Sequence, residues 1–129
     1  MLDGLRSIDR RYVDDFRLER IQGYAETHAV TLDLGLIRQP SRLRLLLTGW
    51  TDYAFSSDNV AAHQAGLPSD PPSLQMQDKG GTWTTIVPEV GIPVGRPQTM
   101  VLDLTHHVPP RARRVQLRIV TSLRVYWDQ

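Results

Sequence analysis

The 129-residue chain contains no cysteine, which excludes a disulfide scaffold, a thiolate zinc site, an iron–sulfur cluster and a cysteine nucleophile. Long apolar runs are also missing. The longest, such as residues 45–47, have three residues, far fewer than the ~18 that a membrane-spanning helix needs. Neither sign of charge dominates, since 15 Lys and Arg against 14 Asp and Glu leave a net charge of +1. Net charge therefore predicts neither a nucleic-acid nor a membrane partner.

An apolar leader is absent from the start of the sequence. Residues 1–20 hold ten charged side chains, where a secretory signal requires an apolar segment. We therefore predict no signal peptide in this sequence. Two explanations stay open: the protein is cytoplasmic, or the sequence is a segment of a longer chain.

What the chain does contain is a series of short segments in which apolar and polar residues alternate. They are centred on residues 30–34, 43–47, 74–76, 83–87, 100–104, 115–119 and 123–127. Alternation of this kind is typical of strands with one buried face. Two packed antiparallel sheets would bury those faces. We predict an all-β antiparallel sandwich over residues 16–129, preceded by an N-terminal arm over residues 1–15.

Between the strands, two local signals are clear. Residues 78–81 (DKGG) predict a hairpin turn, because glycine readily adopts the positive φ that such turns require. One short helix is predicted near residues 59–65, capped by Ser57 or Asp58 and closed by Gly66.

Three further predictions concern the last strand, two tryptophans and the N-terminal arm. The last two alternating segments would make a single strand of ~46 Å, too long for a domain of this size, so we predict a bend near Thr121 and Ser122. Trp83 and Trp127 are in phase with apolar neighbours and are predicted to lie in the core. The N-terminal arm is predicted to become a strand near Phe16.

Several stretches resemble a known family. They are GWTDYAFSSDN (49–59), PPSLQMQD (71–78), GIPVGRPQT (91–99), LDLT (102–105) and RIVTSLRVYWDQ (118–129). From about Phe16 to Gln129 the chain is similar to a C-terminal module of large bacterial proteins that carry tetratricopeptide or FG-GAP/ASPIC-type propeller repeats ahead of it. The resemblance implies an accessory domain of a longer chain, one compatible with export, with a fold similar to galactose-binding-like jelly rolls. It implies no catalytic residues, because the module has no assigned activity.

The loop over residues 50–59 and the loop over residues 91–98 combine aromatic, acidic and amide side chains that could bind a ligand. The candidate ligand-binding residues are Trp50, Asp52, Tyr53, Asp58, Asn59 and Arg96. Oxygen ligands suit calcium, so Asp52, Asp58 and Asn59 are also candidate calcium ligands. The competing interpretation is that these residues form turns and cap the helix. No other cofactor is predicted.

We predict a non-catalytic accessory module that docks against other domains of a parent chain or against a partner protein. Docking requires an apolar patch rimmed by arginine on one sheet face. A carbohydrate-binding domain, with or without calcium, is the first alternative and requires exposed aromatic rings over a polar groove at residues 50–59 and 91–98.

An enzyme with an unrecognised site is the second alternative, and it requires two carboxylates, or a carboxylate and His107, at one pocket. Nucleic acid is not favoured as a partner, although the C-terminal part is rich in arginine, because exposed arginines also protect strand edges. These arginines are Arg111, Arg113, Arg114, Arg118 and Arg124.

Overall fold

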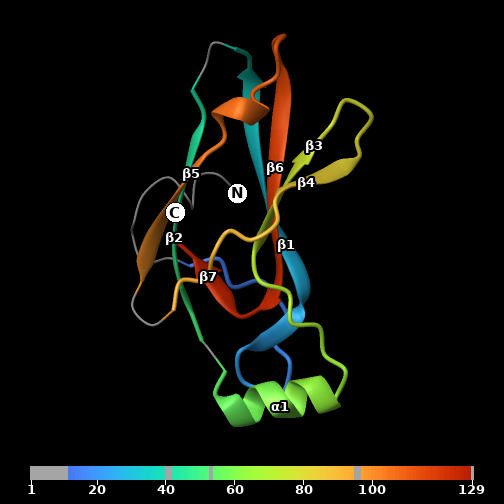
Figure 1. Cartoon of the computed structure of the whole chain (residues 1–129), viewed down its shortest axis with the longest axis vertical. Coiled ribbons are helices and arrows are strands. Elements are labelled where there is room, and N and C mark those ends of the chain that lie inside the picture. Colours follow the sequence, from blue (N-terminus) through green and yellow to red (C-terminus); the bar gives the residue numbers. More distant parts are fainter. Residues whose placement is uncertain (1–11, 40–41, 53, 95–96, 129) are drawn as a thin grey trace.

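The computed structural model describes residues 12–39, 42–52, 54–94 and 97–128. These residues form two antiparallel sheets that share one core, with a helix at one end of the molecule (Figure 1). The elements are β1 (Tyr24–Ile37), β2 (Arg44–Thr51), α1 (Ser56–Gln64), β3 (Ser73–Gln77), β4 (Trp83–Val87), β5 (Gln98–Asp103), the 3₁₀ turn η2 (Thr105–His107), β6 (Arg113–Leu123) and β7 (Val125–Trp127). The prediction of an all-β sandwich is confirmed.

The larger sheet has the strand order β1–β6–β3–β4, and the smaller has β5–β2–β7. Alternation along each strand sends one set of side chains between the sheets. From the larger sheet these include Leu74 and Leu117, both fully buried, and from the smaller sheet Leu47 and Trp127, both at most 3% exposed. The core is therefore built by both sheets, as expected for a sandwich.

The chain passes from one sheet to the other at Arg124. Strand β6 belongs to the larger sheet and ends at Leu123, whereas β7 begins at Val125 in the smaller sheet. The predicted bend near Thr121 and Ser122 is thus present, but it lies two residues later. The backbone N–H of Arg124 donates to the carbonyl of Gly23 across this corner.

Two local predictions need correction. The helix begins at Ser56 rather than near residue 59, and Phe55 is its N-cap residue. Residues 12–23, the described part of the N-terminal segment, make only isolated bridges, Leu18 with Ala25 and Val13 with Trp127. Regular strand therefore starts at Tyr24 instead of Phe16. Within the described ranges, no helix is long and apolar enough to cross a membrane.

The prediction that Trp83 lies in the core is wrong, whereas Trp127 is buried as expected. Trp83 pairs with Gln77 at the start of β4, on the outer face of the larger sheet. There the guanidinium of Arg118 lies over the indole, 4.4 Å from the ring centroid, and its Nε donates to the side chain of Gln75. Strand parity alone does not reveal which face of an edge strand turns inward.

Candidate functional site

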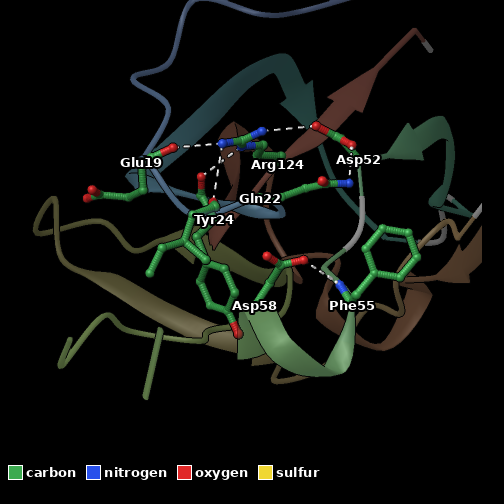
Figure 2. Close-up of polar contacts among 8 residues, drawn as sticks. Glu19, Gln22, Tyr24, Asp52, Phe55, Asp58 and Arg124 are labelled. Atoms are coloured by element: carbon green, nitrogen blue, oxygen red, sulfur yellow. Dashed lines mark hydrogen bonds and ion pairs between the residues drawn. The ribbon is translucent and has the colours of Figure 1, made fainter. Parts of the chain in front are cut away.

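Asp52 follows β2, and its carboxylate binds a guanidinium. Arg124 Nη1 lies 3.0 Å from Asp52 Oδ2, and Gln22 Nε2 lies 3.4 Å from Oδ1 (Figure 2). The Arg124 side chain is 13% exposed, and that of Asp52 36% exposed. A calcium ion at Asp52 would have to compete with this ion pair.

Arg124 also holds the N-terminal segment against the corner between the sheets. Its Nε donates to the carbonyl of Tyr24, and its Nη2 donates to the carbonyls of Glu19 and Ile21 (Figure 2). The planar fork of a guanidinium suits several acceptors that converge from different directions. Arg124 and Asp52 therefore form a structural clamp at the start of β1.

Asp58 and Asn59 lie in the first turn of α1, and each has a partner within the protein. Asp58 Oδ2 accepts a hydrogen bond from the backbone N–H of Phe55 at 2.9 Å, which satisfies a donor at the helix N-terminus (Figure 2). Asn59 Oδ1 accepts the hydroxyl hydrogen of Tyr24 at 2.6 Å. The capping role therefore has direct geometric support.

The three candidate calcium ligands are distributed over separate interactions. Asp52 is bound to Arg124, Asp58 to the helix backbone, and Asn59 to Tyr24. Across the described ranges, no group of three His, Cys, Asp or Glu side chains is arranged to hold a metal ion. Calcium binding by this loop stays a prediction.

Replacing Asp58 separates the two interpretations. We expect Asp58→Ala to lower the free energy of unfolding by about 0.5–1 kcal/mol, equally with calcium and with a chelator, because a helix cap is lost. Thermal unfolding in both solutions is the measurement, and Asp58→Asn, which keeps an acceptor oxygen, is the control. A calcium-induced rise in the Tm of the wild type that Asp58→Asn abolishes would instead establish a calcium site.

Trp50 is not a free ring, because it packs against two other aromatic side chains. It lies on the outer face of the smaller sheet, stacked on Tyr126 with ring centroids 4.5 Å apart, and Tyr12 meets it edge-on. Burial raises the pKa of the Tyr126 hydroxyl, and the nearby carboxylate of Asp52 adds to that effect. The other two candidate ligand-binding residues, Tyr53 and Arg96, lie outside the described residues.

A half-enclosed cavity of about 210 Å³ lies between the loops that the sequence singled out. Thr51, Ala54 and Asn59 line it from one loop, and Ile92 and Val94 from the other. Its lining is mainly apolar. The Thr51 hydroxyl is buried and has no hydrogen-bond partner among the described residues. Trp50 does not line this cavity. Carbohydrate binding at this position stays a prediction.

The outer face of the smaller sheet carries a feature that the sequence reading missed. Leu46 and Val101 are directly opposite each other in the β2–β5 pairing and are 47% and 61% exposed. Each is the middle residue of three consecutive apolar residues, 45–47 and 100–102. Because neighbouring residues of a strand face opposite sides, an apolar triplet places one side chain in water. That signal was present in the sequence.

Polar pairs flank this apolar pair along the same two strands. Toward one side, Thr48 and Thr99 share a hydrogen bond of 2.7 Å. Toward the other, Arg44 lies opposite Asp103. Hydrogen bonds from the Thr105 hydroxyl and backbone lower the pKa of Asp103, so its carboxylate is charged at neutral pH. The face thus combines exposed aliphatic surface with one charge of each sign.

A second concave region lies beside the β3–β4 turn, at the end of the molecule away from α1 (Figure 1). Residues 78–80 of this turn and residues 106–110 line a hollow of about 630 Å³ there. Asp78 and His107 both line it, as the enzyme alternative requires. However, Asp78 Oδ1 already accepts hydrogen bonds from the backbone N–H groups of Gly80 and Thr82. The carboxylate therefore stabilises the hairpin turn.

Comparisons with known proteins found no match: no protein family, no curated protein and no solved structure is similar enough to this chain to assign it. The arrangement of the side chains is therefore what any functional conclusion has to rest on.

Proposed function

We propose that this domain is a non-catalytic docking module and that its docking surface is the outer face of the β5–β2–β7 sheet. The observation that carries the proposal is the exposed cross-strand pair of Leu46 and Val101. Exposed aliphatic side chains that adjoin in this way cost free energy in water and gain it when a partner covers them. Arg44 at one margin of the face supports the proposal, because the docking hypothesis expects arginine at the rim.

The charges on this face define what a partner must present. It needs a carboxylate over Arg44, a basic group over Asp103, and an aliphatic side chain over each of Leu46 and Val101. A second copy of the same face presents all of these groups. A two-fold axis parallel to the strands and midway between β2 and β5 places Arg44 of one copy over Asp103 of the other, and Leu46 over Val101, because these residues are paired in register.

We therefore commit to a second copy of this domain as the partner. Sheets packed face to face lie about 10 Å apart, which suits contact between leucine and valine side chains. In a longer chain of the kind that the sequence resembles, the module would join two such chains. Docking of a different domain on the same face is the competing outcome of the test.

A charge exchange between two variants tests the arrangement. We expect Arg44→Asp alone and Asp103→Arg alone to be monomeric, because each would place like charges opposite each other in a symmetric dimer. Their equimolar mixture should form a heterodimer, since both cross-interface contacts then become complementary. Sedimentation velocity on each variant and on the mixture is the measurement.

A second pair of variants tests the apolar contact between Leu46 of one copy and Val101 of the other. Leu46→Asp is expected to raise the dimer dissociation constant at least about tenfold, a change of ~1.4 kcal/mol. Leu36→Asp, at an exposed leucine on β1, should leave it unchanged. A wild-type chain that stays monomeric at about 1 mM, or a mixture of the charge variants that fails to associate, would overturn the proposal.

A further inference from the structure

We infer that the hollow beside the β3–β4 turn is a binding site for an oxyanion of the phosphate or sulfate class. The hollow of about 630 Å³ continues into a neighbouring one of about 320 Å³, because Lys79, Pro109, Pro110 and Arg113 line both. This site lies outside the docking face and does not depend on it.

Three cationic residues from two separate segments of the chain line the two connected hollows. Lys79 comes from the β3–β4 turn, whereas Arg111 and Arg113 come from the start of β6 and the residues before it. Lys79 and Arg111 are exposed and have no hydrogen-bond or ion-pair partner among the described residues. Lys79 and Arg113 therefore line both hollows, whereas Arg111 lines the smaller one and the carboxylate of Asp78 the larger one.

That carboxylate, Asp78, is directed toward the turn. Its Oδ1 accepts hydrogen bonds from the backbone N–H groups of Gly80 at 2.8 Å and Thr82 at 2.9 Å, so one of its two oxygens is held within the hairpin. Arg113 is also held in place, because its Nη1 donates to the carbonyl of Gln77 at 3.3 Å. The remaining N–H groups of its guanidinium fork can be offered to a ligand.

The shape of the site limits which ligand it suits. The walls include the rigid Pro109–Pro110 pair and the exposed His106 and His107. A tetrahedral oxyanion can accept hydrogen bonds from several cations at once, whereas a single carboxylate presents only two oxygens. The open hollow leaves room for the rest of a phosphate or sulfate ester.

The probe is inorganic pyrophosphate, titrated into the full chain at constant ionic strength maintained with sodium chloride. We expect a dissociation constant at or below about 1 mM, with the amide signals of Lys79, Gly80 and His107 among those that shift in two-dimensional NMR spectra. Lys79→Gln and Arg111→Gln should each weaken binding about tenfold, because each removes a charge-assisted contact. Neither substitution removes a hydrogen bond within the described structure.

Arg114→Gln is the matched control, since Arg114 follows Arg113 on β6 and its guanidinium pairs with Asp33 at 2.6 Å instead of lining the hollow. It should leave the affinity unchanged. Glucose 6-phosphate and glucose 6-sulfate then distinguish a phosphate site from a sulfate site. No saturation by about 10 mM pyrophosphate, or equal losses in Arg111→Gln and Arg114→Gln, would overturn the inference.

Discussion

Replacing Arg124 by alanine is expected to lower the free energy of unfolding by about 3 kcal/mol, because a mostly buried guanidinium and its charge-assisted hydrogen bonds are removed. The Arg124 side chain is only 13% exposed and donates to three backbone carbonyls as well as to Asp52. Alanine would leave these acceptors without their donors at the point where the chain changes sheets. For a domain of this size, the Tm should fall by about 10 °C.

Double variants separate the ion pair from the carbonyl contacts. Most of the loss caused by Arg124→Ala should persist in an Asp52→Asn background, since the carbonyls of Glu19, Ile21 and Tyr24 make up most of the acceptors. Chemical denaturation of the four proteins gives the coupling free energy. Arg114→Ala, which removes an exposed ion pair, should have little effect. A loss below about 1 kcal/mol in Arg124→Ala would mean that the clamp is not structural.

Gly49→Ala is expected to destabilise the domain by about 2–3 kcal/mol, because the added methyl group has no space. A Cβ at Gly49 would lie 2.5 Å from the carbonyl oxygen of Tyr126 and 2.9 Å from Cε3 of Trp127. The first contact is with backbone, which cannot rotate away. Strand β7 has only three residues, so displacing it from β2 would expose the buried indole of Trp127.

The sign of the stability change caused by Gly49→Ala distinguishes a steric clash from the usual effect of this substitution. Glycine to alanine at a position that fits alanine normally stabilises a protein by about 0.4–1 kcal/mol through the unfolded chain. Gly80→Ala is the control, because its Cβ would find its nearest atom, Asp78 Oδ1, at 3.4 Å. Thermal unfolding of both variants is the measurement. A Gly49→Ala protein as stable as the wild type would show that β7 can shift without cost.

The strand pattern could be predicted from residue order because the alternation of side chains is a local property of an extended chain. The segments around residues 43–47 and 115–119 became β2 and β6 for this reason. The bend before the last strand followed from length alone, since an uninterrupted strand would exceed the size of the domain. Trp127 was correctly placed in the core for the same local reason.

The site depended on contacts between distant residues, which local patterns do not encode. From the sequence, Asp52 was a candidate calcium ligand and Trp50 a candidate ligand-binding residue. In the structure, Arg124 pairs with Asp52 and Tyr126 on β7 stacks on Trp50. The sequence by itself thus determined where the strands lie and, except at Trp83 on the edge strand β4, which of their faces are buried, because these follow from periodicity. Only the tertiary structure decided which polar groups are already satisfied, because hydrogen-bond partners are set by how the two sheets and the corner at Arg124 pack together.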